Sequence, residues 1–198
     1  MLIPELDLTT GQVGWVLNDR APAPRVMFNQ LNYLRQLGIP FSPSERHQGR
    51  GHRLRYDFDH LMETGLALTG LRLHLKPADI QELFVAQRAD RRLRCRQALA
   101  EQPEAALTAD WVRSAGAVVS VLGNEIWMRL HDRYAEKPGE IEMLGFEALT
   151  MPEGFTPFDM VERFHGQQIR GLVPLTRLVV KWTALALEAP DMRPGPKV

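Results

Sequence analysis

A stretch rich in arginine and histidine carries the side chains whose chemistry is easiest to recognise in this sequence. Its basic residues fall within ten positions, with Gly49 and Gly51 between them: Arg46, His47, Arg50, His52, Arg53 and Arg55. Guanidinium groups bind phosphate oxygens and displace counterions from a nucleic acid, so this composition favours a polyanionic partner. A run of charges alone is more often a solvated loop. The elements on either side of the run therefore decide between the two interpretations.

Two predicted helices flank the basic stretch. Residues 25–37 carry apolar side chains at helical spacing, and Gly38 suits the left-handed residue that closes a helix. Residues 58–75 show a second helical pattern. Between them, residues 44–57 have the form of a glycine-tipped basic hairpin. A helix, a basic hairpin and a further helix together predict a winged helix-turn-helix, in which the wing lies against a phosphate backbone.

The other expected elements follow from capping residues and spacing. Thr9 and Thr10 precede a short helical segment, Pro24 suits the first turn of the 25–37 helix, and Asp57 or Asp59 is placed to cap the 58–75 helix. Further helices are expected over 77–101 (as one rod or two pieces), from Thr108 to about Leu122, over 156–164 and over 174–189, and a strand within 140–151. The expected fold class is therefore mainly α.

Proline and composition divide the chain into four expected parts. Pro103 marks a boundary after the first helices. We expect a winged helix-turn-helix domain at 5–80, a connecting or dimerisation helix at 81–103, a helical or α+β domain for dimerisation or signal input at 104–190, and a disordered tail at 191–198.

The charges of the chain are unevenly distributed although they cancel overall. The formal net charge is zero, but residues 20–96 hold fourteen Lys or Arg against seven Asp or Glu. Residues 1–19 and 97–198 are both net acidic. Such asymmetry points to nucleic-acid contact better than the total charge does, because salt screens charges more than about 10 Å apart.

Composition excludes several other classes of protein. Cys95 is the single cysteine, so cysteines alone form neither an intrachain disulfide nor a zinc or iron–sulfur site. The first residues lack the basic start and apolar core of a signal peptide, and the apolar run 172–187 is interrupted by Arg177 and Lys181. We therefore expect a cytoplasmic protein that does not cross a membrane and needs no cofactor.

The order of these residues resembles that of the MerR family of bacterial transcription regulators. The resemblance covers about the first half of the chain. Its motifs here are Leu-Asn-Tyr-Leu-Arg-Gln-Leu-Gly-Ile at 31–39, Gly-His-Arg-Leu-Arg-Tyr at 51–56, Phe-Asp-His-Leu at 58–61 and Leu-Lys-Pro-Ala-Asp-Ile at 75–80. Asn32, Leu34 and Arg35 depart from the arginine, tyrosine and glutamate that are usual in the family, and the 18–24 loop is longer.

The resemblance implies a homodimer that binds double-stranded DNA and controls transcription. The recognition helix would lie in the major groove, where arginine reads guanine and Asn or Gln reads adenine. Its candidate contact residues are Arg25, Asn29, Gln30, Asn32, Tyr33 and Arg35. The wing would contribute Arg46, His47, Arg50, His52, Arg53, Arg55 and Tyr56. Apart from the resemblance, the C-terminal half is a candidate site for a small-molecule effector, and the sequence leaves open whether there is one.

Two alternative functions remain open. The nearer one is a winged-helix module that holds a protein partner without binding DNA directly. The other is a small-molecule enzyme centred on the second half, which ranks lowest because no nucleophile–base set or carboxylate pair stands out. We accordingly expect no enzymatic activity.

Three smaller features have structural interpretations that we prefer. His60 and Glu63 share a helical turn but lack a complete set of metal ligands, and acidic residues nearby suit helix capping. Cys95 lies between arginines that would lower the pKa of its thiol, yet a small core residue is the simpler interpretation. The tryptophans of the second half suit a core or an interface better than a ligand pocket.

Overall fold

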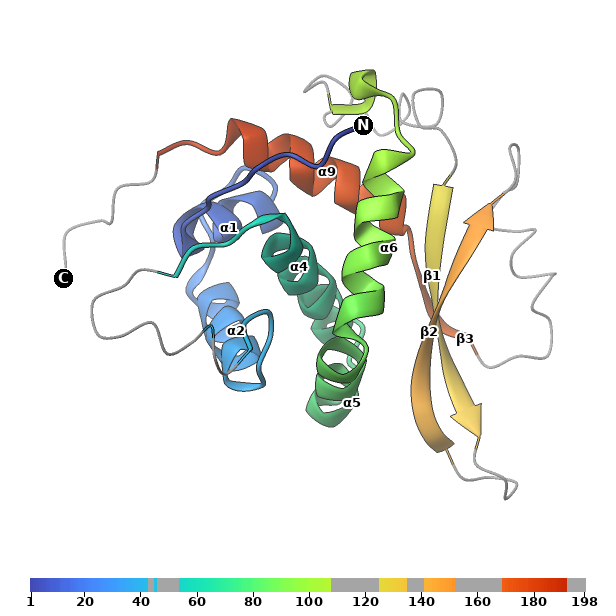
Figure 1. The fold of residues 1–198 in the computed structure, drawn as a ribbon. Helices are drawn as coiled ribbons and strands as arrows, with labels where there is room; N and C mark the ends of the chain where they lie inside the picture. The colour runs from blue at the N-terminus through green and yellow to red at the C-terminus, as the bar shows by residue number, and fades with distance from the viewer. Residues whose placement is uncertain (43–44, 46–53, 108–124, 135–140, 152–168, 192–198) are drawn as a thin grey trace.

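The computed structural model describes residues 1–42, 45, 54–107, 125–134, 141–151 and 169–191, and it is mainly helical (Figure 1). The α-helices are α1 (Thr10–Leu17), α2 (Arg25–Gln36), α4 (Phe58–Arg72), α5 (Pro77–Gln81), α6 (Arg88–Ala100) and α9 (Leu175–Glu188). Shorter helical turns are η1 (Glu82–Ala86) and η2 (Glu104–Leu107). The strands are β1 (Glu125–Tyr134), β2 (Ile141–Met151) and β3 (Ile169–Val173).

Capping residues set where the first helices begin. The Thr9 hydroxyl accepts a hydrogen bond from the Gln12 amide at the start of α1, and the Asp57 carboxylate accepts one of 2.8 Å from the His60 amide at the start of α4. Gly38 has a φ of 91° just beyond α2, in the left-handed region that glycine adopts without strain. The predicted helices at 25–37 and 58–75 are confirmed.

The segment expected over 77–101 consists of consecutive pieces rather than one regular rod. Pro77 opens α5, which passes into the π-helical turn η1, and α6 begins after Gln87. The backbone of Gln87 has φ −108° and ψ 23°, outside the α-helical region. Gln87 therefore interrupts the helix, and of the two arrangements expected for 77–101, one rod or two pieces, the structure has the second.

The strands form one antiparallel sheet with the order β2-β1-β3. The strand expected within 140–151 is confirmed as β2, whereas β1 and β3 were not predicted. The helices expected from Thr108 and over 156–164, and residues 192–198 of the expected tail, lie outside the described residues. The helical or α+β domain expected at 104–190 stays a prediction.

Helix α9, expected over 174–189, is confirmed and packs into the core of the first helices. It contacts α1, α4 and α6, and its Val179 and Val180 are fully buried. The Trp182 ring lies against the glycine of α4 at position 65, where an added Cβ would come within 2.6 Å of the ring. Residues from both ends of the sequence thus share one hydrophobic core.

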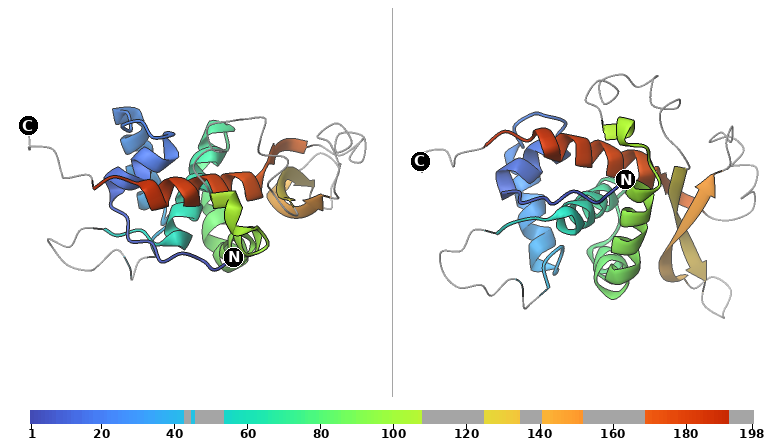
Figure 2. Two further views of the ribbon diagram at one scale, coloured as in Figure 1. Left: turned by 90° about the horizontal axis from the view of Figure 1, so that it is seen from above. Right: turned by 45° about the horizontal axis from the view of Figure 1, so that its top comes forward.

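Helix α2 and the sheet lie on opposite sides of this core, as the three ribbon views agree (Figures 1 and 2). α2 packs on α4, while the sheet adjoins α9 through β1. Helix α2, which the sequence suggests as the recognition helix, is therefore at the surface and far from the sheet.

Among the described residues, no helix has the length and apolar character needed to cross a membrane.

Candidate nucleic-acid interface

Helix α2 presents one apolar and one polar face. Met27, Leu31 and Leu34 are buried against the core, and their spacing of four and three residues places them on one side of the helix. Pro24 precedes the helix, and its carbonyl accepts hydrogen bonds from the Met27 and Phe28 amides. The buried stripe fixes which side of α2 faces outward.

All six residues predicted to contact bases lie on α2, and they differ in exposure. Arg25, Asn29 and Asn32 are exposed in one row along the helix. Gln30, Tyr33 and Arg35 are half-buried. The Arg35 guanidinium also donates a hydrogen bond to the Asn32 side chain. The exposed row is therefore the part of the predicted set best placed to meet a ligand.

Most of the predicted wing falls outside the described residues. This applies to Arg46, His47, Arg50, His52 and Arg53. The two predicted wing residues that the structure does describe, Arg55 and Tyr56, both have partners within the chain. Arg55 donates from Nε to Asp7 Oδ1 over 2.6 Å, and a second ion pair joins the same two side chains.

The prediction that Tyr56 contacts DNA is corrected by its burial. Its side chain is 1% exposed and meets the Phe41 ring edge-on, with the ring centroids 4.9 Å apart. Its backbone forms a two-bond bridge with Leu8. Tyr56 therefore joins the end of the basic stretch to the N-terminal segment and belongs to the core, because a ring in this place cannot reach a phosphate.

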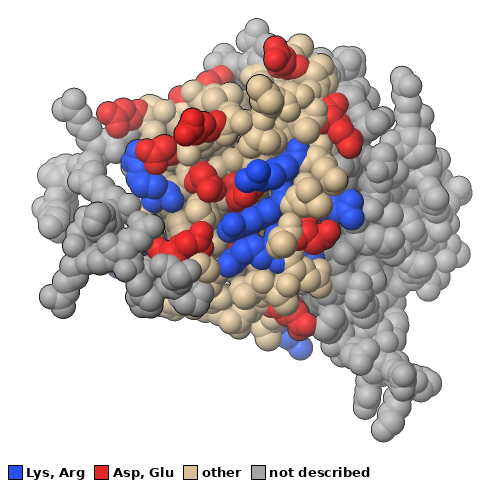
Figure 3. All heavy atoms as spheres, in the orientation of Figure 1, with Lys and Arg blue, Asp and Glu red and all other residues tan. Residues whose placement is uncertain are grey.

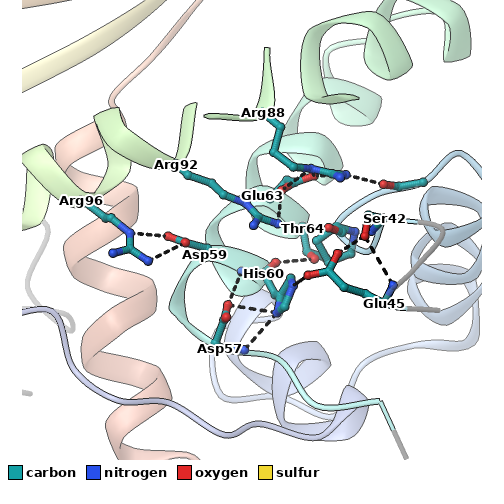
Figure 4. A network of polar contacts seen from close by, with 12 residues as sticks. Ser42, Glu45, Asp57, Asp59, His60, Glu63, Thr64, Arg88, Arg92 and Arg96 are labelled. Atoms are coloured by element: carbon teal, nitrogen blue, oxygen red, sulfur yellow. Dashed lines mark hydrogen bonds and ion pairs between the residues drawn. The ribbon is translucent and has the colours of Figure 1, made fainter. Parts of the chain in front are cut away.

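A buried carboxylate fixes the chain directly after α2 (Figure 4). Glu63 of α4 is 4% exposed and accepts hydrogen bonds from Arg88 Nε at 2.9 Å and Arg92 Nε at 3.1 Å. The same two guanidinium groups donate to the backbone carbonyls of Gly38 and Pro40. This Glu63 clamp joins α4, α6 and the segment that follows α2.

The arginines of the Glu63 clamp compensate in part for the burial of a carboxylate that water hardly reaches. Burial raises the pKa of Glu63, while the neighbouring guanidinium groups of Arg88 and Arg92 oppose that rise. Removing one partner from such a buried pair leaves an uncompensated charge and is strongly destabilising. The clamp is consequently a feature on which the position of the segment after α2 depends.

Neighbouring arginines of α6 are also occupied within the protein. Arg96 forms a two-bond ion pair with Asp59 at 2.9 and 2.7 Å. Arg91 is buried and donates to the Leu83 carbonyl at 2.9 Å, and burial lowers the pKa of Arg91 to about 10. In the space-filling view, a stripe of basic side chains over the middle of this face has acidic side chains directly beside it (Figure 3). The basic residues of α6 therefore form hydrogen bonds and ion pairs with groups of the same chain.

His60 connects the N-cap of α4 to Glu45, which lies just before the basic stretch. Its Nδ1 lies 3.0 Å from Asp57 Oδ1 and its Nε2 lies 3.3 Å from Glu45 Oε1. Burial lowers the pKa of His60, but its contacts with Asp57 and Glu45 outweigh burial, so the pKa lies above its usual 6.5. The bonds from His60 hold the pKa of Asp57 at about 2. A protonated His60 donates to both carboxylates.

The remaining groups singled out from the sequence have structural roles here. Burial raises the pKa of the Cys95 thiol to about 12, which leaves the thiol protonated and fits the preferred interpretation of a core residue. His60 and Glu63 belong to the two separate networks described above. Within the part of the chain that the structure describes, no three His, Cys, Asp or Glu side chains are grouped to hold a metal ion.

Comparison of the chain with protein-family models, with curated proteins and with solved structures finds no match.

Neutralising Glu63 should destabilise the protein. Glu63→Gln is expected to lower the free energy of unfolding by about 3 kcal/mol, because two half-buried guanidinium groups lose their counter-charge. Urea unfolding followed by circular dichroism measures the change. Glu82→Gln, which makes the same substitution at an exposed position of η1, is the matched control. Equal stability of the two variants would contradict the proposed importance of the clamp.

The contribution of His60 to stability should depend on pH. Since its folded-state pKa is raised above 6.5, its stabilising effect is full below that value and is lost as pH rises through the folded-state pKa. The difference in unfolding free energy between wild type and His60→Gln should therefore be larger at pH of about 5.5 than at about 8.5. A difference that grows with rising pH would show that the contacts favour neutral His60.

Proposed function

We propose that this protein binds double-stranded DNA through the exposed row of α2, together with the arginine-rich segment 46–55. The observation that carries the proposal is the surface of α2 and the way its two ends are held. Apart from Val26, its outward side chains are polar, the helix contains no acidic residue, and the chain on either side of it is fixed by polar contacts. A rigid helix of about 18 Å with such a face suits a major groove about 12 Å wide.

Charge and position near α2 support the same conclusion. Arg25 makes no ion pair with any residue that the structure describes, unlike most arginines of α6. Arg25 lies in the first turn of α2, and the N-terminal residues of a recognition helix are those that contact base edges. The arginine-rich segment lies between Glu45 and Tyr56, both described. The Glu45 side chain contacts His60 of α4, the helix on which α2 packs.

The DNA-binding unit in this proposal is a homodimer that regulates transcription. The segment expected to dimerise carries two exposed apolar residues, Val85 in η1 at 40% and Leu93 in α6 at 51%. Pairing two copies through this segment would present two α2 helices to one duplex, at half-sites separated by about 34 Å or a multiple of it. The effector site in this proposal is in the C-terminal half, and about half of the residues there lie outside the described part.

A protein partner is the second candidate for the same surface. Val26 is 67% exposed on α2, and the half-buried Tyr33 lies two turns further along the same side. An apolar residue and an aromatic residue on one helix face suit a protein surface as well as a nucleic acid.

Substitutions should separate the two kinds of DNA contact. Arg50→Ala and Arg53→Ala are expected to weaken binding to every duplex and to reduce the salt slope by about one per lost phosphate contact. Asn29→Ala should instead change sequence preference, by about 1–3 kcal/mol at one base pair. Fluorescence titration against random and selected duplexes at two salt concentrations measures both effects.

The controls remove similar side chains away from α2. Arg94→Ala on α6 and Gln81→Ala on α5 change exposed residues, and neither should alter affinity or preference. If the wild-type protein retains no duplex even at low salt, DNA binding is excluded and the protein-partner candidate is favoured.

A further inference from the structure

The turn between α1 and α2 has an unusual backbone. Asp19 and Arg20 are consecutive residues with φ values of 51° and 65°, in the left-handed region that side chains other than glycine rarely adopt. Such a conformation persists when the surroundings hold it in place. The direction in which the chain enters α2 therefore depends on what holds this turn.

Part of the restraint on the turn comes from α1. The Asn18 amide donates to Gly14, the Arg20 amide donates to the Trp15 carbonyl at 3.0 Å, and the Asn18 side chain donates to the Pro22 carbonyl at 2.9 Å. These bonds close the turn over the end of α1. They restrain the backbone but leave both charged side chains of the turn directed elsewhere.

Those two side chains bind α9, from the other end of the sequence. Lys181 Nζ lies 2.5 Å from Asp19 Oδ1, and Arg20 Nη2 lies 2.5 Å from Glu188 Oε2. Lys181 and Glu188 are seven residues apart, which places them on the same side of α9 two turns apart. Because each member of the turn finds an opposite charge, a shift of α9 that exchanged the pairs would bring like charges together.

Helix α9 connects this turn to the rest of the protein. It follows β3 with only Pro174 between them, and it packs on α1, α4 and α6. Near its end, the Gln12 side chain of α1 donates to the Pro190 carbonyl at 3.2 Å. The turn before α2 is thus attached to an element that begins at the sheet, on the far side of the core (Figure 2).

We infer that Lys181 and Glu188 are positioning residues for α2: by holding Asp19 and Arg20, α9 sets the direction in which α2 leaves the turn, and thereby the affinity of α2 for its ligand. The inference rests on the proposed function for its consequence at DNA, but its structural part stands independently. It makes the docking of α9 a means of regulating the α2 surface from the sheet side of the molecule.

Charge reversal and re-pairing test the inference. The variants are Arg20→Glu, Glu188→Arg and the double variant that carries both changes. A control exchanges the charges of the exposed Asp90 and Arg94 pair within α6, which does not touch the turn. Hydrogen exchange of residues 15–24 is measured in the free protein, and affinity for a random-sequence duplex is measured at low salt.

Each single variant should raise hydrogen exchange in residues 15–24 by about fivefold, because an exposed pair is replaced by repulsion. Each should also lower duplex affinity by about threefold to tenfold, although Glu188→Arg adds positive charge. The double variant should restore both quantities, and the control should change neither. Recovery in the double variant identifies a positioning role. If Arg20 contacted a phosphate directly, an arginine at position 188 would not restore that contact.

Two results would overturn the inference. One is unchanged hydrogen exchange in both single variants. The other is failure of the double variant to recover either protection or affinity while circular dichroism shows an intact fold. If the wild-type protein does not bind duplex, the proposed function fails, and the exchange measurements alone still decide whether α9 holds the turn.

Discussion

The described structure around α2 depends on one buried carboxylate that is shared by two arginines. Glu63 lies in the core side of α4, where an unpaired charge would be very costly, and Arg88 and Arg92 of α6 supply the compensation. Because the same guanidinium groups bind the Gly38 and Pro40 carbonyls, three segments are joined through one charged centre. Apolar burial alone would hold these helices together without fixing the segment after α2 so specifically.

This arrangement changes how the positive charge of residues 20–96 is understood. The sequence suggested one cationic surface for a polyanion, but the described arginines of this region are largely paired with carboxylates: Arg20, Arg55, Arg88, Arg92, Arg94 and Arg96. Their charge is used to organise the fold. What supports the DNA-binding proposal is therefore narrower, namely the acid-free face of α2 and the composition of residues 46–53 within the arginine-rich segment.

Local features could be predicted from the sequence, whereas long-range pairings could not. Helix α2 and its terminating Gly38, and the Asp57 cap of α4, follow from residues within one or two turns of each other. By contrast, Arg88 meets Glu63 across 25 positions and Arg20 meets Glu188 across 168. Helical spacing shows that charges are present on a face but does not show which opposite charge they meet. The burial of Tyr56 was missed for the same reason, because its partner Leu8 belongs to the N-terminal segment.

The most direct test of the account is a nuclear magnetic resonance titration of the isotope-labelled protein with a random-sequence duplex at low salt. The account predicts that resonances of Arg25, Asn29 and Asn32 shift as the duplex is added and return as salt is raised, while those of β1 and β2 stay in place. Shifts confined to the sheet, or an α2 that does not respond at any salt concentration, would contradict it.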